Sequence, residues 1–216
     1  MTWVKICGIR TLEEARAVQR AGADAYGQVF AASPRRLSPD NAARINRSIS
    51  GGILKVGVFV DENLETVKRV VRECRLDIVQ LHGAEPREYL AELDYPVIKA
   101  LSVQQPIGPD DLSRWKAWAL LLDACSPGRR GGTGQRIDPD LLKNLRRFNN
   151  IILAGGLTPD NVAGAIRRYR PMGVDVSSGV EYPHGGKNPQ AILRFMQEVR
   201  EASGIHPGPG RVADNQ

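Results

Sequence analysis

Two residues that could transfer protons lie at the ends of apolar runs. Cys7 ends the run VKIC directly before Gly8, and Asp123 ends the run ALLLD. A thiolate can remove a proton, and a protonated carboxyl group can donate one. Apolar neighbours would raise the pKa of Asp123 toward a value that suits a proton donor. Each residue also has a structural interpretation, because free cysteines are usually small buried side chains and aspartates often cap helices.

Two glycine-containing segments are suited to binding phosphate. Gly155 and Gly156 follow the run IILA, and Ser178 and Gly179 lie in the run GVDVSSGV. Glycine lets backbone N–H groups approach an oxyanion, and the helix that follows presents its positive end. Either segment alone could simply turn the chain. Together they favour a phosphate ester as the ligand.

Other polar residues carry weaker signals. The stretch GGTGQRID (131–138) resembles a phosphate or lid loop but lacks the lysine of a P-loop. His82 and His184 are too few and too separate to indicate a metal site, and His82 is predicted to be a core or supporting residue. Arg35 and Arg36 fall in a loop after an apolar run, so Arg35 remains a candidate for binding an anion.

Apolar runs alternate with amphipathic stretches along the whole chain. The predicted strands span residues 4–9, 25–30, 54–60, 77–83, 97–103, 119–125, 151–157 and 173–180. The predicted helices span residues 11–23, 38–45, 62–74, 83–93, 110–118, 138–148, 158–169 and 188–199.

Eight such units favour a (β/α)8 TIM barrel, an α/β fold, over an open sheet, which usually has fewer strands and a reversal of strand order. We expect one domain over residues 1–202, followed by a Gly/Pro-rich tail, 203–216, that is disordered. Active sites of such barrels lie at the carboxyl ends of the strands. The barrel would therefore bring Cys7, Asp123 and the two glycine-containing segments together.

The net charge of +6 does not predict a nucleic-acid partner. The arginine pairs are scattered, without interleaved aromatic residues that could stack on bases, so they are typical of solvated surfaces. These pairs lie at 35–36, 129–130, 146–147 and 167–168.

Cysteine usage and hydropathy indicate the compartment. Cys7, Cys74 and Cys125 are an odd number, far apart and without a CxxC pair, and no leader-like segment precedes them. A cytoplasmic location is therefore expected. No apolar run approaches the roughly 20 residues that cross a bilayer, so no membrane partner is expected.

Several motifs together resemble one enzyme family. KICGI, GADAYGQVFAASPRRLSP, VGVFVDE, VQLHG, LLLDA followed by GGTG, LAGGLTPDNV and DVSSGVE occur in the order and spacing of the phosphoribosylanthranilate isomerases of tryptophan biosynthesis. The resemblance runs from about residue 4 to residue 199, and KICGI and DVSSGVE are its most specific parts. The family's fold is the (β/α)8 barrel.

The resemblance implies a role for each candidate residue. Cys7 would be the general base, Asp123 the general acid and Arg35 the partner of the anthranilate carboxylate. The phosphate would rest on the backbone around Gly155, Gly156, Ser178 and Gly179. The sequence departs from the family pattern at Gln28, at Ala124 and in the segment GGKN (185–188).

The implied reaction is an Amadori rearrangement of N-(5-phosphoribosyl)anthranilate to the corresponding 1-amino-1-deoxyketose. It needs two proton transfers and neither a cofactor nor a metal. The expected partner is this small phosphosugar, and the expected assembly is a monomer or a homodimer.

Two other functions fit parts of the sequence. Another phosphosugar isomerase or epimerase would share the phosphate motifs, and a barrel that only binds its ligand would share the fold. The presence of both a cysteine base and an acid argues against each of them.

Overall fold

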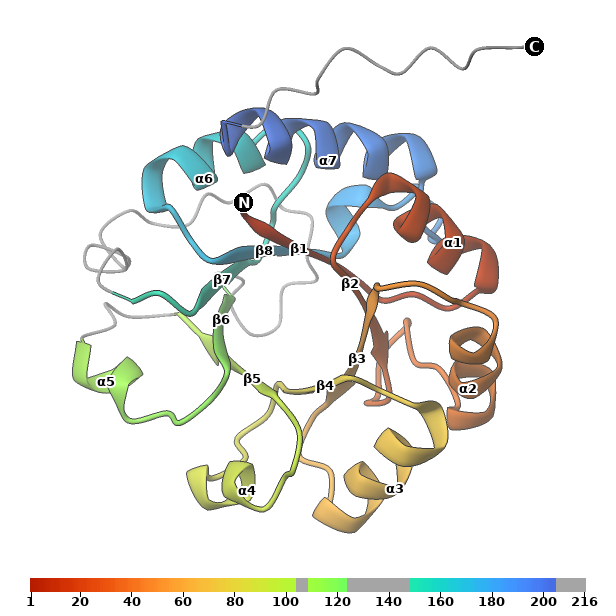
Figure 1. Cartoon of the computed structure of the whole chain (residues 1–216), viewed down its shortest axis with the longest axis vertical. Helices are drawn as coiled ribbons and strands as arrows, with labels where there is room; N and C mark the ends of the chain where they lie inside the picture. Colours follow the sequence, from red (N-terminus) through yellow and green to blue (C-terminus); the bar gives the residue numbers. More distant parts are fainter. Residues whose placement is uncertain (104–108, 124–147, 205–216) are drawn as a thin grey trace.

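Eight parallel strands form a closed barrel in sequence order (Figure 1). The computed structural model describes residues 1–103, 109–123 and 148–204. β1 pairs with β8 to close the barrel, so the predicted (β/α)8 architecture is confirmed. The strands are β1 (Trp3–Cys7), β2 (Ala25–Val29), β3 (Leu54–Phe59), β4 (Ile78–Leu81), β5 (Val97–Ser102), β6 (Ala119–Asp123), β7 (Ile151–Ala154) and β8 (Gly173–Val176).

Helices surround the barrel on its outside (Figure 1). They are α1 (Leu12–Ala21), α2 (Pro39–Arg47), α3 (Leu64–Cys74), α4 (Arg87–Ala91), α5 (Pro109–Ser113), α6 (Val162–Tyr169) and α7 (Pro189–Ala202), with a 3-10 helix η3 (Ser178–Val180) after β8. Within the described ranges, no helix has the length and apolar character of a membrane span.

Some predictions fall outside the described residues. These concern Ala124, Cys125, the arginine pairs at 129–130 and 146–147, the loop 131–138 and nearly all of the helix predicted over 138–148. The predicted tail begins at 203, one residue after α7 ends, and its residues 205–216 also lie outside the described part of the chain. The two-part division of the chain therefore stays a prediction.

Local sequence explains where α1 begins and ends. Thr11 and Glu14 form the predicted capping box, in which each side chain accepts a hydrogen bond from the other residue's backbone, and Gly22 ends the helix in the left-handed region at φ 78°. The second carboxylate oxygen of Glu14 accepts a hydrogen bond of 2.9 Å from the backbone N–H of Lys187. This one side chain therefore also joins α1 to the loop after β8.

Alternation along β1 separates two environments. Val4 and Ile6 pack in the core between the strands and the helices. Lys5 and Cys7 alternate with them and so face the barrel interior. Deeper in the barrel, the interior is filled by aliphatic side chains such as Val56. Inside the described part of the barrel, polar side chains thus lie at the carboxyl ends of the strands and in the layer just beneath them.

On the outer side of the barrel, a buried ion pair connects β5 with the loops after β3 and β4. The Lys99 ammonium lies 2.5 Å from a carboxylate oxygen of Glu85 and 2.6 Å from the carbonyl oxygen of Gly83, and both charged side chains are 2% exposed. Glu85 also accepts hydrogen bonds from the backbone N–H groups of Asp61 and Gly83. Lys99 therefore fixes the loops after β3 and β4 and does not line the pocket at the strand ends.

We predict that Lys99→Met lowers the free energy of unfolding by about 3 to 5 kcal/mol, because it leaves the Glu85 carboxylate buried without its cation. Urea unfolding followed by circular dichroism measures this loss. The matched control is Arg69→Met, since the Arg69–Glu73 pair is half exposed and should contribute less than about 1 kcal/mol. Equal losses in the two variants would contradict the assignment of Lys99 as a structural charge.

Candidate active site

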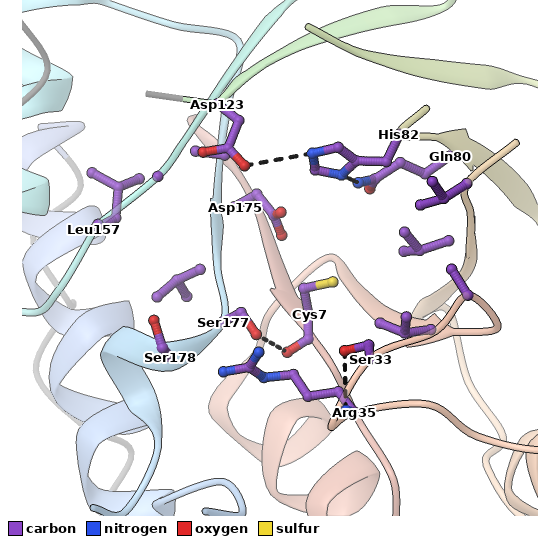
Figure 2. Close-up of a pocket in the computed structure, with 18 of the residues that line it drawn as sticks. Cys7, Ser33, Arg35, Gln80, His82, Asp123, Leu157, Asp175, Ser177 and Ser178 are labelled. Carbon is purple, nitrogen blue, oxygen red and sulfur yellow. Dashed lines mark hydrogen bonds and ion pairs between the residues drawn. The ribbon is translucent and has the colours of Figure 1, made fainter. Parts of the chain in front are cut away.

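The carboxyl ends of the strands enclose a pocket of about 410 Å³. Figure 2 shows its lining side chains, which come from opposite sides of the barrel. Six of the predicted site residues line it: Cys7, Arg35, Asp123, Gly155, Gly156 and Ser178. The sequence did not single out Gln80, Asp175 and Ser177 as site residues, yet they line the same pocket.

Cys7 lies at the end of β1, and its side chain reaches into the pocket (Figure 2). The residue is buried, with 8% of its surface exposed. Ser177 donates a hydrogen bond of 3.1 Å from Oγ to the carbonyl oxygen of Cys7. Gly8 then turns the chain at φ 83°, a conformation that glycine adopts without strain. The thiol is thus held at a fixed place on the pocket wall.

Asp123 ends β6 and faces His82 from the loop after β4 (Figure 2). His82 Nε2 lies 3.5 Å from an oxygen of Asp123, and its Nδ1 lies 3.2 Å from Nε2 of Gln80. The structure places His82 on the pocket wall with 34% of its side chain exposed, so it is a supporting residue at the site and not a core residue. Its position two residues beyond Gln80 on the same strand end is the signal that could have predicted this.

The two glycine-containing segments form one wall of the pocket. Gly155 and Gly156 have φ values of 87° and 65°, which a side chain would strain. Asn161 braces this turn, because its side chain donates to the carbonyl oxygen of Gly156. A Cβ on Gly179 would lie 1.9 Å from the carbonyl oxygen of Leu157, so only glycine lets η3 approach the loop after β7. The predicted phosphate segments are therefore packed against each other.

Arg35 lies at the pocket edge and is held by Glu181. Its Nε and Nη2 each lie 2.7 Å from one carboxylate oxygen of Glu181, a two-pronged ion pair. The Arg35 side chain packs directly against Gly8: a Cβ at Gly8 would lie 2.5 Å from Arg35 Cδ. Arg36 lies instead beside a separate cavity between the loop after β2 and α3. Of the two neighbouring arginines, only Arg35 reaches the pocket.

Glu181 is shared between Arg35 and the buried Lys187. The Lys187 ammonium lies 2.7 Å from Glu181 and also donates to the carbonyl oxygen of Ser177. Partial burial would raise the pKa of Glu181, but hydrogen bonds from Arg35 and Lys187 and the charge of both cations outweigh it and lower the pKa to about 2. Glu181 and Lys187 support the pocket edge through these contacts, and the sequence analysis assigned them no role, although both lie close after the motif DVSSG.

A second ion pair lies beneath the pocket inside the barrel. The Lys5 ammonium is fully buried and lies 2.8 Å from an oxygen of Asp175, which reaches up into the pocket. Among the residues that the structure describes, no cluster of three or more histidine, cysteine or acidic side chains could hold a metal ion.

The pocket thus offers a thiol and a carboxyl group as proton carriers, glycine-rich backbone for an oxyanion and an arginine for a second anion. A family model described as N-(5'phosphoribosyl)anthranilate (PRA) isomerase matches residues 4–198. A curated relative, the N-(5'-phosphoribosyl)anthranilate isomerase of Syntrophomonas wolfei, is 55% identical over 201 residues, covering 93% of this chain and 98% of the relative. The enzyme of the same name from Desulforudis audaxviator is 48% identical and covers 94% and 100%.

Solved structures agree with this likeness. The phosphoribosyl anthranilate isomerase of Thermotoga maritima superposes with a TM-score of 0.83 at 39% identity and covers 95% of this chain and 100% of its own. A further phosphoribosyl anthranilate isomerase, described in complex with reduced 1-(o-carboxyphenylamino)-1-deoxyribulose 5-phosphate, superposes at 0.78 with 38% identity and the same coverage.

The low pKa of Glu181 predicts a dependence of stability on pH. The pKa is about 2 in the folded protein and roughly 4.3 in an unfolded chain, so the carboxylate stabilises the fold above about pH 4, and this contribution is lost as the pH falls toward 2. Glu181→Gln should therefore lower the melting temperature at pH 7, and its difference from the wild type should shrink as the pH falls below about 4. Thermal melts over this pH series test it, and a difference that stays constant with pH would contradict it.

Proposed function

The chain belongs to the family of N-(5'-phosphoribosyl)anthranilate isomerases, and we propose that Cys7 is the general base and Asp123 the general acid of its reaction. The enzyme isomerises N-(5'-phosphoribosyl)anthranilate to 1-(2-carboxyphenylamino)-1-deoxyribulose 5-phosphate in tryptophan biosynthesis. The observation that carries the assignment is that one thiol and one carboxyl group, 116 positions apart in the chain, both line a pocket with a glycine-rich wall.

The proposed mechanism has two proton transfers. The protonated carboxyl group of Asp123 gives its proton to the ring oxygen of the ribose as the ring opens, which leaves an iminium ion at C1. The Cys7 thiolate then removes the proton from C2, and the electron pair of that C–H bond forms the C1–C2 double bond of an enolamine. Protonation at C1 and loss of the hydroxyl proton at O2 complete the ketone. His82 Nε2 lies 3.5 Å from this carboxyl group and faces it in the pocket.

The two ends of the substrate fit two parts of the pocket. We assign the phosphate to the wall formed by the turn at Gly155 and Gly156 and by Ser178 and Gly179, because glycine lets backbone N–H groups approach an oxyanion. The anthranilate carboxylate is assigned to Arg35. A guanidinium has five N–H donors, of which Glu181 takes two, so its remaining edge can bind a second carboxylate.

The assembly and the compartment complete the proposal. The proposed assembly is a monomer or a homodimer. The cytoplasm is the proposed compartment, because the base must remain a free thiol. A small phosphosugar is the proposed partner, without nucleic acid.

We predict that Cys7→Ala and Asp123→Asn each lower kcat by roughly two to four orders of magnitude, because each removes one proton carrier and keeps the fold. The fluorescence of freshly made substrate measures its consumption. Cys74→Ala is the matched control, since Cys74 is buried against α2 far from the pocket lining and should keep its turnover. A variant at position 7 or 123 that turns over at nearly the wild-type rate would mean that another residue moves the proton.

We predict that Arg35→Ala weakens kcat/KM by roughly 10- to 150-fold, which corresponds to about 1.5 to 3 kcal/mol for a charged hydrogen bond. Arg35→Lys should also lose activity, because an ammonium cannot form two parallel bonds to a carboxylate. Arg36→Ala is the control and should lose much less.

An aniline analogue without the carboxylate separates the possible roles of Arg35. The wild type should process it poorly, and Arg35→Ala should add little further loss. If Arg35→Ala harms both substrates equally, Arg35 supports the loop or the phosphate and does not bind the carboxylate.

A further inference from the structure

We propose that Lys5 is a positioning residue that holds Cys7 in its thiolate form. The proposal rests on the role of Cys7 as the base. Lys5 touches no substrate site, since its side chain is fully buried beneath the pocket, and it would act only through the thiol.

The geometry places the Lys5 ammonium beside the thiol. Lys5 and Cys7 are two residues apart on β1 and face the barrel interior together. Both side chains pack against Gly27 of β2: a Cβ at Gly27 would lie 2.8 Å from Cys7 Sγ and 3.1 Å from Lys5 Nζ. The missing side chain of Gly27 therefore provides the space in which sulfur and ammonium approach each other.

Lys5 stays charged in this interior. Burial by itself would lower its pKa, but the charge of Asp175 and then that of Cys7 raise the pKa above its ordinary value. The ammonium lies 2.8 Å from Asp175, which gives it one counter-ion. A buried cation with a single anionic partner is well placed to stabilise a second anion nearby.

Cations outnumber carboxylates among the charged side chains nearest to Cys7. Two carboxylates and three cations surround it from β1, from the loop after β2 and from β8 with its following loop. The carboxylates are Asp175 and Glu181, and the cations are Lys5, Arg35 and Lys187. His82 and Asp123 line the same pocket from β4 and β6. This excess of cations beside the thiol favours a thiolate at Cys7.

The competing explanation is that Lys5 only neutralises Asp175. The two explanations predict different effects of substitutions at Lys5 and Asp175 on the ionisation of the Cys7 thiol. If Lys5 acts on Cys7, removing Lys5 must disfavour the thiolate, whereas removing the charge of Asp175 must favour it. If the pair is merely structural, Lys5→Met and Asp175→Asn should disturb the site in the same direction.

Alkylation by iodoacetamide reads the thiolate directly. The rate at Cys7 is measured as a function of pH by mass spectrometry of its peptide, in the wild type and in both variants. The plateau at high pH reports access to the sulfur, and the midpoint reports how readily the thiol ionises. Cys74 is fully buried and serves as an internal reference, because its labelling would reveal unfolding.

We expect Lys5→Met to raise the midpoint by roughly 1 to 3 pH units and Asp175→Asn to lower it, with similar plateaus. Lys5→Met should also lose turnover at neutral pH and regain it as the pH rises. Midpoints that move in the same direction, or do not move, would overturn the proposal. If Lys5→Met does not fold, Asp175→Asn decides alone, because a midpoint that rises or stays unchanged overturns it.

The same experiment keeps this proposal separate from the proposed function. The alkylation midpoints report the effect of Lys5 on the thiol whether or not the thiol is catalytic. Full turnover by Cys7→Ala would refute the role of Cys7 as the base, while opposite midpoint shifts would still establish the effect of Lys5.

Discussion

The ion pair between Lys5 and Asp175 joins the first and last strands inside the closed barrel. β1 and β8 are adjacent only because the barrel closes, and Lys5 lies directly opposite Asp175 in their register. The same closure sets Ser177 beside Cys7, whose carbonyl oxygen it binds. A buried pair of this kind adds little to stability when compared with apolar residues, but losing one partner is costly. The proposed effect of Lys5 on Cys7 gives this pair a role besides stability.

Above this pair, the loops at the mouth of the barrel are joined by charged side chains. Glu181 binds Arg35 on one side and Lys187 on the other, so the loop after β2 and the loop after β8 share one carboxylate. Glu14 joins α1 to the same loop through the backbone of Lys187. The proposed proton carriers, Cys7 and Asp123, thus lie at strand ends, while the proposed anion-binding groups lie on loops that these side chains hold in place.

Periodic features made most of the barrel predictable. Apolar runs predicted the eight strands, helical spacing and capping residues predicted the helices, and the strand ends predicted that Cys7 and Asp123 would line one site. The sequence could not predict which strand-end residues face inward. Lys99 and His82 both lie near such ends, yet Lys99 points away to Glu85 and His82 faces Asp123. That orientation depends on the phase of each strand, which the register of its neighbours decides.

Long-range pairs were beyond prediction for a related reason. Arg35 and Glu181 are 146 residues apart, and no local pattern links them. Predicted strands also ran past their true ends: the strand predicted over 77–83 is β4, which ends at Leu81, although the backbone N–H of His82 still donates to the carbonyl oxygen of Phe59 on β3.

The most direct test of this account is a crystal structure of the protein with the reduced product, 1-(2-carboxyphenylamino)-1-deoxyribulose 5-phosphate. The account predicts the phosphate against Gly156 and Ser178, the carboxylate on Arg35, and Cys7 Sγ about 3 to 3.5 Å from C2 of the sugar. Asp123 should then lie beside the oxygen that belonged to the ribose ring. A ligand bound with its C2 away from Cys7, or with its phosphate at Arg35, would contradict the assignment of base, acid and binding groups.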